Sequence, residues 1–178
     1  MSCFGLLRAS HQLSRWQWLV VLLCASVPVF ADHPLPAPTA EVILEVHGKA
    51  RRSAGYDHAR LDRGILASLK RTELVTHTSV TDGPQHFSGY LMRDLLEYVG
   101  AKGKKVVASA LNSYAIVFSS EEFDRYDVLI ADTQNGKQLL PSDKGPFWIV
   151  YPRDQHSELQ DIRYDYRWVW QLVRLDIE

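Results

Sequence analysis

Residues Gly145–Ile177 read GPFWIVYPRDQHSELQDIRYDYRWVWQLVRLDI and carry the strongest structural signals of the chain. Phe147–Tyr151 is a short run of aromatic and β-branched residues that stops at Pro152, which predicts a buried strand. Apolar and polar residues alternate over residues 173–178, as in a strand with one solvated face. Between the two strands lies a polar loop rich in arginine, aspartate and tyrosine. We therefore expect the rest of the chain to hold this loop in place.

Short strands dominate the rest of the chain. Alternation and β-branched composition predict them at Glu41–His47, Thr72–Val80, His86–Leu91, Lys104–Ala108, Tyr114–Phe118 and Val128–Ala131. Asn135-Gly136 predicts a hairpin turn, because a type I′ turn needs positive φ at both central residues.

Two helices and one helical turn are expected among these strands. Helical spacing from Leu61 to Leu69 predicts a helix capped by Asp57, and a second apolar stripe predicts a helix over Met92–Val99. Ser119 and Glu122 have the spacing of a capping box, which predicts a short helical turn. The sequence thus indicates an α+β fold with a mixed, mainly antiparallel sheet and few short helices.

The first 31 residues have the pattern of a signal peptide. Arg8 and Arg15 precede an apolar run over Trp16–Val29, and Ala31 is the small residue that a cleavage site requires. The arginines are not paired, which favours the general secretory route and export of an unfolded chain to the periplasm. An uncleaved membrane anchor is the alternative, although the run is shorter than the roughly 20 residues that span a bilayer.

The remaining chain is expected to be one domain, residues 41–178, after a proline-rich linker over residues 32–40. Both cysteines, Cys3 and Cys24, lie in the signal, so the exported chain has no thiol. The signal also holds two of the 20 basic residues and none of the 21 acidic ones, which leaves 18 against 21 and a net charge of −3. This mild acidity gives no reason to expect nucleic acid or, after cleavage, a membrane as partner.

Five motifs occur in an order that resembles a known family. They are FSGYLMRDLLEYVGA (87–101), ALNSYAIVFSSEEF (110–123), DVLIADTQNGKQL (127–139), GPFWIVYP (145–152) and RWVWQLVRLDI (167–177). This order resembles the molybdopterin-binding domain of the sulfite oxidase family, and more closely the small exported proteins that consist of that domain alone. The resemblance covers roughly residues 42–178, and its order is more specific than any one motif. It implies a pyranopterin cofactor that carries molybdenum, and oxidoreductase activity.

The chain departs from the family at the metal ligand. In the family one cysteine thiolate binds molybdenum from the strand that corresponds to Thr72–Thr78, and no cysteine occurs there. A soft thiolate suits a molybdenum–dithiolene centre, and neither threonine nor histidine replaces it easily. The family's His and Arg around the GPFW motif correspond to Asp143 and Trp148, whereas its basic residue near the C-terminus is kept in kind as Arg167.

The resemblance and the residue types give a set of candidate cofactor-binding residues, namely Arg167, Arg153, Lys144, Asp143, Asn112 and Tyr114. Arg153, Arg163 and Arg167 either form an anion pocket or pair with acids of the same loop. Asp143 and Lys144 either edge that pocket or belong to a plain turn. Asn112 and Tyr114 either line the cofactor cleft, as in the family, or are ordinary loop and strand residues.

The aromatic and histidine residues leave similar alternatives. Trp148, Trp168 and Trp170 either stack on a planar ligand or belong to the core. His77 lies on the strand that carries the metal ligand in the family, but the histidines show no spacing typical of zinc sites. We therefore assign no catalytic residue and no metal ligand from the sequence.

Two functions from different classes remain open. One is a non-catalytic module that binds a small anionic ligand, or a periplasmic or sensor protein partner, in the cleft that holds the cofactor in the family. The alternative is a molybdopterin-dependent oxidoreductase whose metal has no protein thiolate. Family enzymes receive their cofactor in the cytoplasm and are expected to be exported folded, so the missing thiolate and the unpaired arginines both favour the binding module.

Overall fold

The structure, a computed structural model, describes residues 33–178. The expected signal peptide, residues 1–31, lies outside the described residues, and export to the periplasm stays a prediction. Over residues 33–178, every helix is too short or too polar to cross a membrane.

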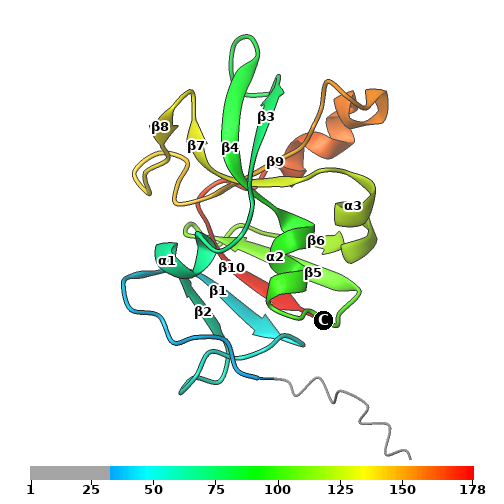
Figure 1. Ribbon diagram of the computed structural model, residues 1–178. Coiled ribbons are helices and arrows are strands. Elements are labelled where there is room, and N and C mark those ends of the chain that lie inside the picture. Colours follow the sequence, from blue (N-terminus) through cyan, green and yellow to red (C-terminus); the bar gives the residue numbers. More distant parts are fainter. Residues whose placement is uncertain (1–32) are drawn as a thin grey trace, which may run out of the picture. The chain divides into compact units, whose positions relative to one another are not determined.

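The predicted C-terminal strand lies at the centre of a five-stranded sheet with the order β2-β1-β10-β5-β6 (Figure 1). Its strands are β1 (Val42–Gly48), β2 (Ala59–Asp62), β5 (Lys105–Ala110), β6 (Ala115–Ser119) and β10 (Leu172–Ile177). β1 and β10 run parallel, and the other neighbouring strands run antiparallel. The last strand, β10, therefore lies between β1 and β5 and joins them in one sheet.

A second sheet has the order β3-β4-β7-β8, and β9 also pairs with β7. Its strands are β3 (Arg71–Thr76), β4 (Gln85–Leu91), β7 (Leu129–Gln134), β8 (Lys137–Gln138) and β9 (Trp148–Val150), all paired antiparallel. Asn135 and Gly136 have φ values of 49° and 74°, as the predicted hairpin turn requires. The mixed, mainly antiparallel pairing is confirmed, but it is divided between two sheets.

The helices are short. They are α1 (Arg63–Leu66), α2 (Met92–Tyr98), α3 (Ser120–Arg125) and two 3-10 helices, η1 (Ser157–Gln160) and η2 (Ile162–Arg167). α2 confirms the helix expected after the FSGYL motif, and Gly100 follows it with a φ of 60°. α3 confirms the helical turn expected after Ser119.

The prediction of a helix that Asp57 caps is wrong. Ala59 and Leu61 are fully buried because they belong to β2, which pairs with β1. The cap is Asp62, whose Oδ1 accepts a hydrogen bond from the Ile65 amide at 2.8 Å, and only the single turn of α1 follows. Leu61 fits both periods, and pairing with β1 decides between them.

The described part of the expected linker lies against the domain. Leu35 is buried and forms an isolated β-bridge with Ser53. The amides of Thr39 and Ala40 donate to Asp62 Oδ2 at 2.7 Å and 3.0 Å. Asp62 thus joins this segment to the start of α1.

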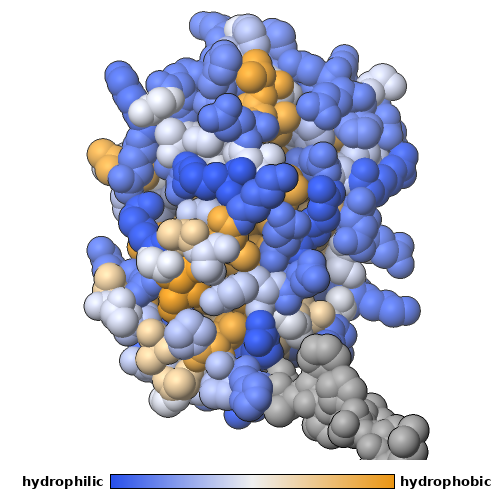
Figure 2. Space-filling view, in the orientation of Figure 1, coloured by the Kyte–Doolittle hydropathy of each residue, from blue (hydrophilic) through white to orange (hydrophobic). Residues whose placement is uncertain are grey.

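The two sheets and α2 enclose the apolar core. At Gly89 in β4 the strands approach closely, since a Cβ there would lie 2.0 Å from the Ile130 carbonyl oxygen of β7. The view in Figure 2 shows hydrophilic residues over most of one face of the molecule, with smaller apolar areas among them.

Candidate functional site

The aromatic residues of the C-terminal stretch divide between core and surface. Trp148 on β9 is fully buried, and its ring meets those of Trp168 and Trp170 edge-on at centroid distances of 6.2 Å and 6.3 Å. Trp168 is buried, whereas Trp170 is 39% exposed. Of the two alternatives for these residues, Trp148 and Trp168 belong to the core, and Trp170 remains open to a ligand.

Arg167 pairs with a carboxylate from another part of the chain. Its Nη1 lies 2.5 Å from Oε2 of Glu122 on α3, and the other oxygen of Glu122 accepts a hydrogen bond from the Tyr151 hydroxyl at 2.6 Å. The expected capping box does not form, since Ser119 makes no side-chain cap and Glu122 points to Tyr151 and Arg167. These three residues, the Glu122 network, tie α3 to the residue that directly follows β9 and to η2.

The electrostatics of the Glu122 network follow from its burial. Burial raises the pKa of the Tyr151 hydroxyl far above its ordinary value, and the Glu122 carboxylate raises it further. Burial is the largest single influence and would lower the pKa of Arg167, but Glu122, Tyr151 and Tyr166 together outweigh it and the pKa is raised. Arg167 is therefore a permanent cation that already has a counter-ion.

The other arginines of the expected anion pocket are also engaged within the chain. Arg163 makes two bonds to Asp161, at 2.9 Å and 3.0 Å, on an exposed surface. Arg153 donates to the carbonyl of Gln160 at 3.2 Å. The alternative of an internal network is thus what the structure shows for Arg163 and Arg167, although the acid that pairs with Arg167 comes from outside its loop.

Asp143 and Lys144 lie in the turn that precedes β9. They pair with each other at 3.1 Å, and the Lys144 ammonium lies 5.5 Å from the centre of the Trp148 ring. Asp143 lines a different hollow from the one at Asn112 and Tyr114. The structure therefore shows the plain turn and does not bring this pair to one pocket with the arginines.

Asn112 and Tyr114 line a small hollow, which we call the aromatic recess. Its lining includes Asn112, Tyr114, Asp165, Tyr166, Trp168 and Trp170, and its volume is about 200 Å³. The Tyr114 hydroxyl donates to the Tyr166 carbonyl at 2.8 Å, which joins the two sides. Asp165 Oδ1 and Trp168 Nε1 are buried and have no hydrogen-bond partner among residues 33–178. Two of the residues that line the recess therefore each hold a buried polar atom without a hydrogen-bond partner.

The residues at the family's metal position do not fit a molybdenum–pterin group. Thr76 on β3 is buried, and its hydroxyl donates to the His77 carbonyl and accepts from the Asp154 amide. His77 Nδ1 lies 2.9 Å from the Asp154 carboxylate. Hard oxygen donors with hydrogen bonds of their own are poor ligands for a metal that favours a thiolate. The volume of the aromatic recess is also smaller than the roughly 300–1,000 Å³ of ordinary ligand sites.

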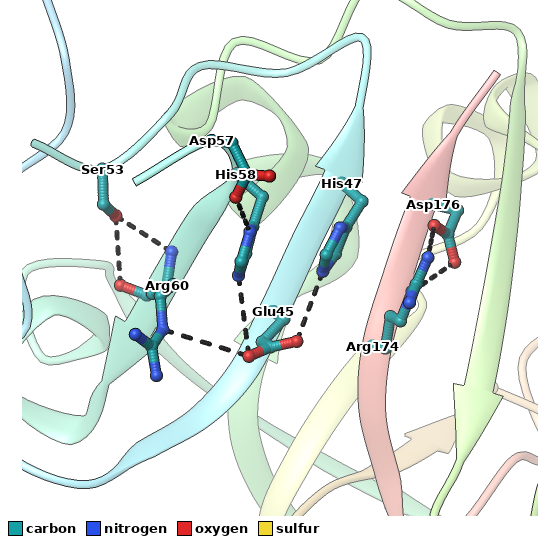
Figure 3. Close-up of polar contacts among 8 residues, drawn as sticks. All are labelled: Glu45, His47, Ser53, Asp57, His58, Arg60, Arg174 and Asp176. Atoms are coloured by element: carbon teal, nitrogen blue, oxygen red, sulfur yellow. Dashed lines mark hydrogen bonds and ion pairs between the residues drawn. The ribbon is translucent and has the colours of Figure 1, made fainter. Parts of the chain in front are cut away.

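A second group of polar residues was missed in the sequence. Glu45 and His47 on β1 meet His58, which comes just before β2 (Figure 3). The signal was present in part, since residues 45 and 47 share one face of a predicted strand. Because residues 59–62 were expected to be helical, nothing in the sequence placed His58 beside Glu45 and His47.

Comparison with known proteins bears on the fold. The sequence matches no protein-family model, and no curated protein matches it. Among solved structures, the chain is similar to the sulfane dehydrogenase SoxCD from Paracoccus pantotrophus, with a TM-score of 0.56 and 19% sequence identity. The match covers 75% of this chain and 37% of that chain, so this chain spans little more than a third of that protein. The protein therefore has the α+β fold of the sulfite oxidase type that the order of its motifs predicted.

Proposed function

We propose that this protein is a non-catalytic binding module, in which the aromatic recess takes a ring-sized group from a small ligand or from a partner protein. The observation that carries the proposal is the pair of buried, unpartnered atoms, Asp165 Oδ1 and Trp168 Nε1. A buried polar atom without a partner costs free energy, which a ligand with matching groups recovers.

The rim of the recess supports binding from solvent. Tyr114, Tyr166 and Trp170 are 41%, 50% and 39% exposed. Large aromatic residues around a small hollow are typical of contact sites between molecules. The rim therefore favours a partner that covers these side chains while one of its groups enters the recess.

The charge of the recess selects the ligand class. Asp165 brings a carboxylate, and Arg167, the expected anion ligand, is held by Glu122. A planar group with a donor or a positive charge suits this arrangement better than an anion. The anionic ligand expected from the sequence requires Arg167 to leave Glu122.

Nuclear magnetic resonance with three small probes tests this proposal. Benzamidine, indole and benzoate share a ring but differ in charge, and the indole N–H signal of Trp168 reports on the recess. We expect saturable shifts with benzamidine, weaker ones with indole and none with benzoate. Asp165→Asn should abolish the difference between benzamidine and indole, and Trp170→Ala should weaken both.

Val80→Ala is the matched control, since Val80 is 52% exposed and lies outside the lining of the recess. Shifts that are equal for all three probes, or unchanged by Asp165→Asn, would overturn the proposed ligand class. Preferential binding of benzoate would support the anion-binding alternative.

The alternative of a molybdopterin-dependent oxidoreductase rests on the fold alone. The printed activity of SoxCD, sulfane dehydrogenation, belongs to a protein that this chain matches over 37% of its length. The donor groups near Thr76 do not favour that activity here.

A further inference from the structure

Three side chains on the solvent face of the first sheet point to one place (Figure 3). Glu45 and His47 are two residues apart on β1 and so lie on one face, opposite the buried Val46. The antiparallel register pairs Val46 with Ala59, which sets His58 beside His47. Within residues 33–178, this is the one group of three His, Cys, Asp or Glu side chains whose possible ligand atoms all lie within 4.8 Å of one another.

The separations between these atoms suit a metal ion. Glu45 Oε2 lies 3.3 Å from His47 Nε2, and Glu45 Oε1 lies 3.6 Å from His58 Nε2. A tetrahedral ion with bonds of about 2.1 Å holds its donor atoms about 3.4 Å apart. The distances from the Glu45 carboxylate to the two imidazole nitrogens thus already match the spacing between ligand atoms of one ion.

The tautomer of His58 leaves a lone pair in the same place. Asp57 Oδ1 lies 2.6 Å from His58 Nδ1, so that nitrogen carries the proton. His58 Nε2 is then an acceptor, and it is buried without a hydrogen-bond partner. It faces the Glu45 carboxylate, another acceptor, and the two repel each other unless a proton or a cation lies between them. A carboxylate on the far nitrogen is also what orients metal-binding histidines.

The surrounding charges leave room for a cation. Arg60 Nε is 3.9 Å from Glu45 Oε1, but its guanidinium packs over the Tyr56 ring at 4.5 Å. Arg174, opposite Glu45 on β10, bonds Asp176 at 2.8 Å and 2.5 Å. With both histidines neutral, these two arginines and the carboxylates of Glu45, Asp57 and Asp176 sum to a net charge of −1 (2 − 3), which favours a cation.

We propose that Glu45, His47 and His58 bind one divalent transition-metal ion, with Asp57 as the positioning residue for His58. Two imidazoles and one carboxylate favour Zn²⁺ or Cu²⁺ over Mg²⁺ and Ca²⁺, which prefer oxygen ligands. The His47 and His58 rings are stacked at 4.0 Å with an angle of 11° between their planes. In this arrangement the nitrogen lone pairs of the two rings point in parallel directions. Binding one ion therefore requires one of the two rings to rotate, so that both nitrogens point at it.

Calorimetric titration with ZnCl₂ tests this site. The protein is the full chain after chelator treatment, with Cys3 and Cys24 replaced by serine so that no thiol competes. We expect one Zn²⁺ per chain. His47→Gln and His58→Gln should each weaken binding at least ~10-fold, and Asp57→Asn about 10–100-fold, with all three ligands retained. His86→Gln, an exposed histidine of the other sheet, is the matched control and should bind as the parent does.

Two further readouts separate this site from nonspecific binding. Electron paramagnetic resonance of the Cu²⁺ form should show two nitrogen ligands, falling to one in His58→Gln. At a free Zn²⁺ concentration of 100 times Kd, the ratio of folded to unfolded protein should rise about 100-fold. The unfolding midpoint of each variant is also measured without metal, to show that the variant folds. If a histidine variant does not fold, Glu45→Gln replaces it as the variant that lacks one ligand.

Zn²⁺ binding of equal affinity in the His47→Gln/His58→Gln double variant would overturn the proposal, as would equal competition by MgCl₂. A Cu²⁺ spectrum without nitrogen coupling would also overturn it.

Discussion

The Glu122 network is expected to be the most sensitive polar feature of the fold, and Glu122→Ala tests it. The Glu122 and Arg167 side chains are 13% and 22% exposed, and Tyr151 is fully buried. Removing the carboxylate leaves the Tyr151 hydroxyl without its acceptor and Arg167 without its counter-ion.

The magnitude follows from these two losses. A hydrogen bond to a charged group contributes about 1.5–3 kcal/mol, and leaving a buried charge unpaired costs about 3–5 kcal/mol. Because Arg167 is partly exposed, water recovers much of the second term, and we expect a total loss of about 3 kcal/mol. For a domain of this size each kcal/mol lowers Tm by about 2–4 °C, so the shift is roughly 6–12 °C.

Urea unfolding of the parent, Glu122→Ala and Glu122→Gln measures the effect. The glutamine variant keeps an acceptor for Tyr151 and should fall between the other two. Glu121→Ala is the control, since Glu121 is exposed on the same helix, and its effect should stay within about 0.5 kcal/mol. A loss below about 0.5 kcal/mol for Glu122→Ala would refute the reasoning, because that is the range of an exposed ion pair.

Three other predictions concern the stability of the fold. The amides of Ile65 and Thr39 lower the pKa of Asp62 below its ordinary 3.8, so the unfolded chain binds more protons; its stabilisation is present above pH ~4 and lost in more acid solution. Asp62→Asn should therefore show a smaller drop in urea midpoint between pH 7 and pH 3, and an unchanged drop would contradict this. Gly89→Ala should cost several kcal/mol (about 3 or more) or prevent folding, because its Cβ meets the Ile130 carbonyl; a parental urea midpoint would show that the strands can move apart. Arg71→Lys loses the paired bonds to Asp132, at 3.0 Å and 2.7 Å, and should cost about 1 kcal/mol at pH 7 by the same assay, whereas no change would mean that a point charge suffices.

The strands and turns were largely predictable because local physics determines them. The alternation at residues 173–178 and the Asn135-Gly136 turn each need only a few residues to be recognised. The sheet order was not predictable, since β1 pairs in parallel with β10 across most of the chain. The error at Asp57 has a related cause: Leu61 satisfies both helical and strand spacing, and only its pairing with β1 decides.

The candidate site was less predictable than the fold. The sequence marked Arg167 as a candidate anion ligand, but its counter-ion, Glu122, lies 45 residues earlier on α3. Glu122 was interpreted as part of a capping box because a local partner was the only one visible in the sequence. The cluster at Glu45 and His58 depends on strand register in the same way, which no spacing rule reveals.

We propose that a fold of the sulfite oxidase type serves in this protein as a binding module without molybdenum chemistry. The most direct test is elemental analysis for molybdenum, together with fluorescence of the oxidised pterin extract, on one sample purified from the protein's own cells. We expect neither molybdenum nor pterin in stoichiometric amount. Close to one molybdenum and one pterin per chain would contradict it, and would direct the search for an unusual ligand to His77 and the strand before it.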